Sequence, residues 1–167
     1  YIFINLVFFM ETVKWGILGA AKIAKEQVIP AMKKSKNTEL YAIASRDISK
    51  AEDFCHKFAI TKAYDDYNKL ISDPNIDAVY IPLPNHLHVP FSINSLKAGK
   101  HVLCEKPISI TSDEIFELMQ VQKETKKIVS EAFMVRFHPQ WIQTKKLIQE
   151  GEIGKLNAIQ GLFNYFN

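Results

Sequence analysis

Short apolar runs alternate along the chain with segments whose apolar residues recur at helical spacing. The runs predict buried strands, and the spaced segments predict amphipathic helices. Predicted strands cover residues 13–18, 40–44, 78–83, 101–104 and 128–133, and predicted helices cover 21–34, 47–58, 65–72, 84–96, 111–127 and 139–150. Strands that alternate with helices form a parallel sheet covered on both faces. We therefore predict an α/β fold with a doubly wound parallel sheet.

Residues that cap helices support several of these boundaries. Asp47 is a favourable N-cap residue, and Thr111 with Glu114 has the spacing of a capping box. Gly99 follows a predicted helix, where glycine is common as the residue after the last turn. Pro30 lies late in the first predicted helix, and we expect it to end or kink that helix.

The two ends of the chain differ from its alternating middle. Residues 1–9 read YIFINLVFF, a run too short to span a membrane and without the basic segment of a signal peptide. Met10 resembles a natural start, so we interpret residues 1–9 as an upstream extension, with an extra edge strand as the alternative. Residues 155–166 are strand-like and aromatic but have no partner left in the sequence. This predicts that the chain stops inside a second domain.

Composition narrows the class of protein. Hydrophobic residues make up 47% of the 167 residues and charged residues 23%, as in a soluble globular protein. The formal charge of +3 comes with lysines spread over helix faces, which argues against nucleic-acid binding. The two cysteines form no metal-binding spacing, so we expect no metal. Nothing in the sequence requires an oxidising compartment or a membrane, so we expect a cytoplasmic protein.

A candidate phosphate-binding turn lies between the first predicted strand and the first predicted helix. Residues 16–24 read GILGAAKIA. Against the pattern G-x-G-x-x-G/A of Rossmann folds, Gly19 is the first glycine, Ala24 is the last small residue, and Ala21 replaces the second glycine. A pyrophosphate would bind the N–H groups at the helix start, and the Ala21 methyl would displace it slightly or require a different backbone angle. The motif alone leaves a tight turn without a ligand as the alternative.

The residues after the second predicted strand bear on which dinucleotide would bind. An acidic residue at this strand end would bind the ribose 2′-hydroxyl of NAD. The chain has Ser45 and Arg46 there, whose hydroxyl and guanidinium suit a 2′-phosphate. Asp47 follows directly, but its N-cap position accounts for it. We therefore expect NADP rather than NAD, with a plain surface role as the alternative for Arg46.

Two longer motifs follow the next strands. Residues 76–88 read IDAVYIPLPNHLH, and residues 98–107 read AGKHVLCEKP. Together with EAFMVRFHPQW at 131–141 and GEIGKLNAIQG at 151–161, they closely resemble the Gfo/Idh/MocA family of oxidoreductases. The chain looks most similar to the branch with glucose-fructose oxidoreductase, NADP xylose dehydrogenase and dihydrodiol dehydrogenase. The resemblance extends from Val13 to the end of the chain.

The resemblance implies the domain organisation and the activity. It implies a dinucleotide-binding Rossmann domain at 10–135 and, at 136–167, the first elements of a truncated C-terminal open-sheet domain for substrate binding and dimerisation. It implies hydride transfer between NADP and a sugar, polyol or diol, by a full-length form that is a homo-oligomer.

The resemblance also implies the site residues. Cofactor contacts are expected from Gly19, Ala20, Ala21, Lys22, Ile23, Ser45, Arg46, Pro82, Leu83, Pro84, Asn85, His88, Glu105, Lys106, Pro107 and Arg136. Lys106 is the expected catalytic residue, because a cationic lysine stabilises the negative charge that develops on an alcohol losing hydride. Glu105 beside it favours the charged ammonium, so a role as proton relay comes second. The family also implies a cis peptide bond before Pro107.

One part of the family pattern is missing from the sequence. The second domain of the family supplies an Asp and, a few residues on, a His or Tyr that donates or accepts the proton. No such segment is present before Asn167. We expect either a fragment of a full enzyme or a truncated gene, with a stand-alone module as the third explanation. The alternative function is therefore a non-catalytic dinucleotide-binding module.

Overall fold

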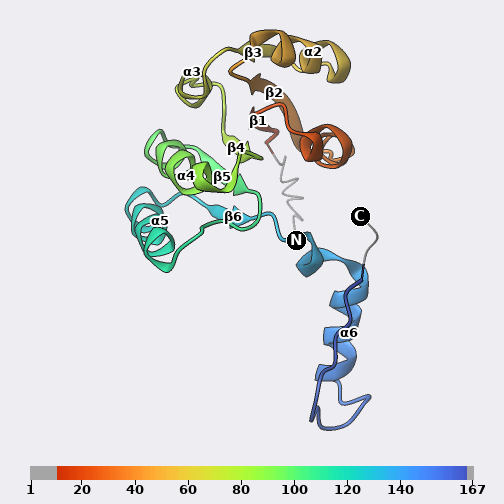
Figure 1. The fold of residues 1–167 in the computed structure, drawn as a ribbon. Helices are drawn as coiled ribbons and strands as arrows, with labels where there is room; N and C mark the ends of the chain where they lie inside the picture. Colours follow the sequence, from red (N-terminus) through yellow and green to blue (C-terminus); the bar gives the residue numbers. More distant parts are fainter. Residues whose placement is uncertain (1–10, 165–167) are drawn as a thin grey trace, which may run out of the picture. The chain divides into compact units, whose positions relative to one another are not determined.

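The computed structural model describes residues 11–164, and the extension expected at 1–9 lies outside the described residues. A six-stranded parallel sheet has the strand order β3-β2-β1-β4-β5-β6 (Figure 1). Its strands are β1 (Val13–Leu18), β2 (Thr38–Ala44), β3 (Lys62–Tyr64), β4 (Ala78–Ile81), β5 (His101–Cys104) and β6 (Val129–Glu131). The direction in which strands are added reverses between β1 and β4. Ligands of such sheets bind beyond the carboxyl ends of the strands at this reversal.

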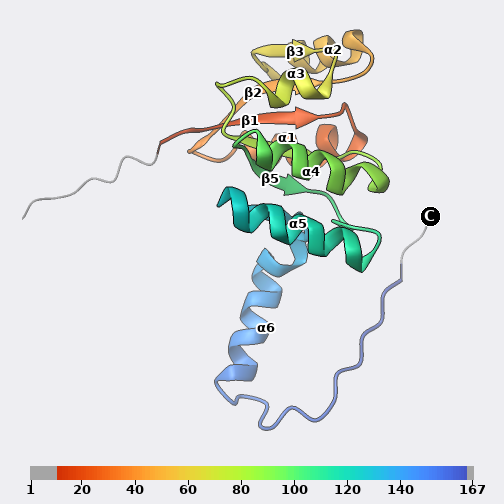
Figure 2. The same cartoon turned by 90° about the vertical axis from the view of Figure 1, so that its left-hand side faces the viewer.

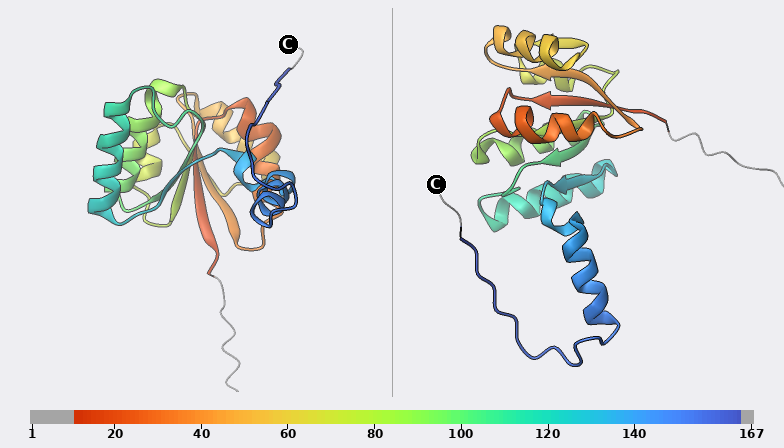
Figure 3. Two further views of the ribbon diagram at one scale, coloured as in Figure 1. Left: turned by 90° about the horizontal axis from the view of Figure 1, so that it is seen from below. Right: turned by 90° about the vertical axis from the view of Figure 1, so that its right-hand side faces the viewer.

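Helices cover both faces of the sheet (Figure 2). One face carries α3 (Tyr67–Ile71), α4 (His88–Lys97) and α5 (Ser112–Thr125), and the opposite face carries η1 (Ala24–Val28), α1 (Ile29–Met32) and α2 (Ile48–Phe58) (Figure 3). A short 3-10 helix, η2 (Asn85–Leu87), precedes α4. The predicted doubly wound α/β fold is confirmed.

Each face of the sheet has its own apolar core. Successive strand residues point to opposite faces, so Ile17 packs in the core beneath α1 and α2, whereas Leu18 packs in the core beneath α4 and α5. All four residues of β4 are buried. A strand covered on both sides must be apolar at every position, which is why these strands read as continuous apolar runs.

The predicted helix boundaries rest on the caps that the structure shows. Asp47 accepts a hydrogen bond from the Ser49 backbone N–H, and Thr111 with Glu114 forms the capping box, so both predictions are confirmed. The first predicted helix is interrupted as Pro30 implies. Residues Ala24–Val28 wind as a π-helix before a short α-helix that contains Pro30, because proline has no N–H to continue the regular ladder.

The structure differs from the sequence prediction at two places. Strand β3 was not predicted, because it has only three residues and lies at the sheet edge, where no residue of it is fully buried. The strand predicted at 155–166 is wrong for the described residues 155–164, which contain no strand. A strand needs a neighbour for its N–H and C=O groups, and no described strand pairs with this segment.

A division between Ala132 and Phe133 separates two compact units. The second unit contains the 3-10 helix η3 (Met134–Phe137) and α6 (Pro139–Gln149), whose N-cap His138 accepts a hydrogen bond from the Gln140 N–H. No residue of α6 is buried. This unit begins close to the domain boundary that the family resemblance implies.

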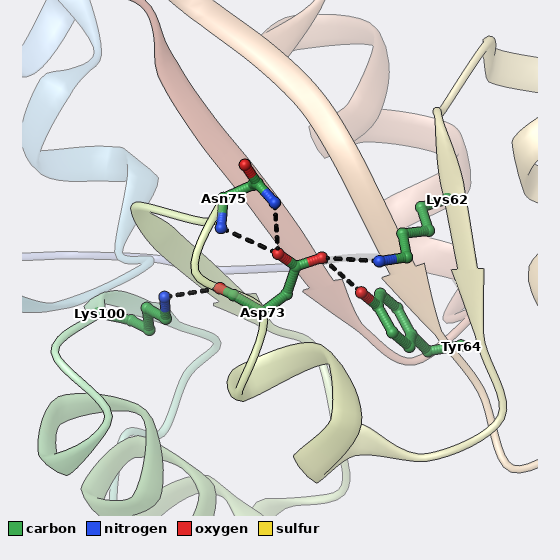
Figure 4. Close-up of polar contacts among 5 residues, drawn as sticks. All are labelled: Lys62, Tyr64, Asp73, Asn75 and Lys100. Carbon is green, nitrogen blue, oxygen red and sulfur yellow. Dashed lines mark hydrogen bonds and ion pairs between the residues drawn. The ribbon is translucent and has the colours of Figure 1, made fainter.

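A buried carboxylate ties the loop before β4 to its surroundings (Figure 4). Asp73 accepts hydrogen bonds from the Lys62 ammonium at 3.0 Å and from the Tyr64 hydroxyl. The backbone and side-chain N–H groups of Asn75 both donate to its other oxygen at 2.9 Å. The buried Lys100 ammonium donates to the Asp73 carbonyl at 2.7 Å. The cluster thus joins β3, the α3–β4 loop and the residue before β5.

The charge of Asp73 is stabilised by these donors. Burial raises the pKa of the Asp73 carboxyl, but hydrogen bonds from Tyr64, Asn75 and Lys62 outweigh it, so the pKa lies well below its usual range. A carboxyl whose pKa is lower when folded stabilises the fold above its unfolded pKa of about 3.9. That contribution is lost as pH falls through the lower folded value.

We predict that Asp73→Asn lowers the free energy of unfolding at pH 7 by about 1–3 kcal/mol, because it removes a buried carboxylate that accepts hydrogen bonds from Lys62, Tyr64 and Asn75. Urea denaturation at pH 7 and pH 3 measures the effect. The difference in free energy of unfolding between the native chain and the variant should be smaller at pH 3. Asp65→Asn, which removes an exposed pair with Lys69, is the control and should change little. A difference that stays constant with pH would contradict the role given to the Asp73 charge.

Candidate functional site

Four turns follow the parallel strands at one end of the sheet. They comprise residues 19–23 after β1, 45–46 after β2, 82–87 after β4 and 105–108 after β5; we call them together the carboxyl edge. All four lie at the same end because the strands are parallel. Fifteen of the sixteen predicted contact residues lie on or directly beside this edge, and Arg136 belongs to the second unit.

The turn after β1 is built around Gly19. Its φ is +109°, a conformation that side chains other than glycine rarely adopt. A Cβ at this position would lie 3.1 Å from Leu83 Cδ2, so the turns after β1 and β4 touch here. The Gly19 N–H donates to the Ala44 carbonyl at 2.8 Å, which fixes the turn to β2. Gly19 thus places bare backbone where the order of the strands reverses, between β1 and β4.

The helix start beside Gly19 tolerates the alanine at position 21. Among the described residues other than glycine, only Ala59 and Lys126 have positive φ. Ala21 thus has an ordinary backbone angle, and glycine is not required there. Ala24 is fully buried, as the last small position of the pattern requires. The first N–H groups of a helix have no partner within the helix, which makes this start suitable for an anion.

In the turn after β2, Ser45 is buried and Arg46 is exposed. Ser45 is 7% exposed, and its hydroxyl accepts a hydrogen bond from the Asp47 N–H at 3.2 Å. Arg46 is exposed. The Asp47 carboxylate accepts hydrogen bonds from the backbone N–H and the hydroxyl of Ser49. The predicted N-cap role of Asp47 therefore holds, and Arg46 is the free charged group at this strand end.

The turn after β4 has a buried and an exposed half. Pro82 and Leu83 are buried, whereas Pro84 and Asn85 are exposed. His88 begins α4 and is only 1% exposed. Its Nδ1 lies 2.7 Å from the Pro107 carbonyl oxygen and its Nε2 lies 2.7 Å from the Leu83 carbonyl oxygen. His88 thus lies beneath the carboxyl edge, with both ring nitrogens engaged by backbone.

The turn after β5 displays Lys106 and is held from below. The buried Tyr80 hydroxyl donates to Glu105 Oε1 at 2.7 Å. Burial raises the pKa of Tyr80, and the Glu105 carboxylate adds to the rise, so Tyr80 remains a hydrogen-bond donor. Lys106 is exposed, and the expected cis bond before Pro107 is confirmed.

Two contributors to this turn were missed at the sequence level. Glu131 at the end of β6 accepts a hydrogen bond from the Ile108 N–H at 2.9 Å, and Tyr80 holds Glu105 as described. A tyrosine inside an aliphatic strand was a usable signal, because a buried hydroxyl needs a partner. Glu131 carried no such signal.

Residues 11–164 show no metal-binding cluster, no membrane-spanning helix and no reactive thiol at Cys104. No group of three or more His, Cys, Asp or Glu side chains there could hold a metal ion. No helix in this range is long and apolar enough to cross a membrane. Burial raises the pKa of Cys104 to about 12, so this residue is an inert part of the core, as expected.

Comparison with known proteins agrees with the geometry of the edge. D-xylose 1-dehydrogenase (NADP(+)) 2 of Haloferax volcanii is 38% identical over 90% of this chain and 46% of its own length. Trans-1,2-dihydrobenzene-1,2-diol dehydrogenase of Mus musculus is 34% identical over 91% of this chain and 46% of its own length. The chain spans about half the length of the curated relatives it matches.

Solved structures and the family profile also match oxidoreductases with a Rossmann fold. A 3-ketoreductase from Actinomadura kijaniata, crystallised with NADP, superposes with a TM-score of 0.81 at 36% identity, covering 87% of this chain and 46% of that chain. Residues 13–133, which form most of the sheet unit, match the profile of an oxidoreductase family with an NAD-binding Rossmann fold. The resemblance stated from the motifs is therefore confirmed, and the chain belongs to the Gfo/Idh/MocA family of oxidoreductases.

Proposed function

We propose that the chain is the dinucleotide-binding half of an NADP-dependent dehydrogenase or reductase that acts on a sugar, polyol or diol. The observation that carries the proposal is the turn at Gly19, where a φ of +109° and the 3.1 Å approach to Leu83 leave no place for a side chain. A pyrophosphate at a helix start needs this close approach to the backbone. The ordinary backbone at Ala21 fits the same ligand.

Different residues of the carboxyl edge have different roles in this proposed reaction. Bound NADP supplies a hydride donor or acceptor at C4 of its nicotinamide. Lys106 is exposed on the turn after β5, where its ammonium would stabilise negative charge on the substrate oxygen. Glu105 directly precedes Lys106 in the chain, and the Tyr80 hydroxyl fixes its carboxylate. Lys106 therefore acts first by its charge and hydrogen bonds, and only second as a proton relay.

The relatives support the substrate class. Their names specify D-xylose and a dihydrobenzenediol, and the crystallised neighbour is a 3-ketoreductase. All three transformations interconvert a hydroxyl carbon and a carbonyl carbon or its equivalent. We also place the protein in the reducing cytoplasm, because Cys55 and Cys104 are both free.

The exposed guanidinium of Arg46 makes the choice of cofactor testable. We predict that Arg46→Ala raises the Kd for NADPH by about 10–100-fold, the loss of one or two charge-assisted hydrogen bonds to phosphate. The Kd for NADH should change little, because NADH has no 2′-phosphate. Fluorescence titration of both nucleotides measures the two constants. Lys57→Ala, an exposed lysine in the last turn of α2, is the control for general loss of positive charge.

The same titrations test the proposal as a whole. Equal effects of Arg46→Ala on NADPH and NADH would remove the 2′-phosphate role. A folded chain that binds neither nucleotide would contradict both the enzyme and the binding module. Binding without turnover of aldoses, ketoses or diols, by a protein that contains this chain, would favour the non-catalytic module.

A further inference from the structure

His88 connects two turns of the carboxyl edge that are far apart in sequence. Its imidazole lies between the carbonyl oxygens of Leu83 and Pro107, at 2.7 Å from each. The first carbonyl belongs to the turn that displays Pro84 and Asn85, and the second belongs to the turn that displays Lys106. One ring thus spans the neighbouring ends of β4 and β5.

The chemistry of this contact requires histidine. A backbone carbonyl oxygen only accepts hydrogen bonds, so each bond needs a hydrogen on the ring nitrogen that faces it. Each ring nitrogen of His88 faces one of the two carbonyl oxygens, and a nitrogen that carries hydrogen donates to the oxygen in front of it. Asparagine and glutamine carry their donors on one nitrogen and cannot reach two carbonyls on opposite sides. Histidine therefore suits the position, because its two ring nitrogens lie on opposite edges of a flat side chain.

The rest of the turn after β5 is fixed at its two ends. Tyr80 holds the Glu105 side chain at 2.7 Å, and Glu131 holds the Ile108 N–H at 2.9 Å. His88 holds the carbonyl between them, at Pro107. Of these three contacts, only that of His88 continues to the neighbouring turn at Leu83. Beyond the backbone bond from the Glu105 N–H to the Ile81 carbonyl, where the strands end, His88 therefore adds a side-chain link between the two turns.

We propose that His88 is a positioning residue, which sets Lys106 relative to the Pro84–Asn85 turn by bridging the two backbones. The proposal rests on the proposed function, since it assigns the bridged turns to the nicotinamide half of the dinucleotide. Because His88 is 1% exposed, it acts through these turns and touches no ligand, in place of the cofactor contact that the family resemblance implies for it. The adenosine half, at Gly19 and Arg46, lies on other turns and should not depend on the bridge.

The test compares a whole dinucleotide with a fragment of it. Adenosine 2′,5′-bisphosphate contains the 2′-phosphate but no nicotinamide. In His88→Gln we expect the Kd for NADPH to rise about tenfold, the effect of one lost buried hydrogen bond. The Kd for the fragment should stay unchanged. His56→Gln, an exposed histidine in the last turn of α2, should alter neither constant, and circular dichroism confirms that both variants are folded.

Each outcome decides the question. An unchanged Kd for NADPH, or an equal loss of NADPH and fragment, would overturn the positioning role. If the native chain binds neither ligand, the proposed function fails and the positioning role fails with it. The bridge is then still testable in amide NMR spectra, where His88→Gln should shift the Lys106 and Ile108 signals and His56→Gln should not.

A measurement on the unmodified chain covers the case in which His88→Gln does not fold. NMR of the native imidazole should show contacts from one edge of the ring to Leu83 and from the other edge to Pro107. A ring with contacts to one turn only would overturn the bridge.

Discussion

Turnover should fall by about 10²–10⁴-fold when Lys106 is replaced with alanine in an active protein that contains this chain, the range expected when a group that stabilises transition-state charge or transfers a proton is removed. The Kd for NADPH should change little, because Lys106 is an exposed residue at the far turn from Gly19 and Arg46. Steady-state kinetics with a fixed substrate, together with fluorescence titration of NADPH, measures both quantities.

Lys106→Arg separates the two roles open to this residue. Arginine keeps the positive charge but cannot give up its proton in proteins. Partial recovery of turnover relative to Lys106→Ala would support the electrostatic role. Equal activities of the two variants would favour proton relay. Lys123→Ala, on the exposed side of α5, is the control, and unchanged turnover in Lys106→Ala would remove Lys106 from the mechanism.

Binding of both NADPH and NADH should weaken by about 100-fold or more in Gly19→Val, because strain and displacement fall on the same turn that receives the pyrophosphate. The φ of +109° is unfavourable for valine, and its Cβ would lie 3.1 Å from Leu83 Cδ2. The turn must move to accept the side chain. The expected loss is therefore one of affinity for either nucleotide, measured by fluorescence titration of folded protein.

Gly99 provides a matched control for backbone strain. It also has a positive φ, at +81°, but a Cβ there would meet nothing within 4 Å. Gly99→Val should therefore destabilise the chain by strain alone and leave both Kd values unchanged. If Gly19→Val binds nucleotide as tightly as Gly99→Val does, the phosphate turn lies elsewhere.

The sequence was most informative where burial constrains every position. Strand β4 is buried at all four residues, so its apolar run could be recognised without any neighbour. Strand β3 has three residues, one exposed and two half-buried, and leaves no such signal. Residues 155–164 show the opposite error. Their aromatic composition favours a strand, but strand formation depends on a partner that composition does not reveal.

The candidate site divides in the same way. Gly19 and Arg46 were predicted because each follows a strand and parallel strands end at one edge, whereas Lys106 was predicted from the resemblance to the family. The contacts beneath them were not predicted. Tyr80 and Glu105 are 25 residues apart in sequence and become neighbours only when β4 pairs with β5. Local patterns identify which groups reach the edge, whereas the side chains that hold them depend on the pairing of strands.

The cap at Asp47 links cofactor preference to the integrity of α2. Its carboxylate is the acidic group nearest to the ribose position in sequence, yet it already accepts two hydrogen bonds from Ser49. Redirecting this carboxylate toward a ribose hydroxyl would remove the helix cap, at about 1 kcal/mol of stability. A laboratory conversion of the domain toward NAD would therefore best place its new acidic residue at position 46 and leave Asp47 untouched.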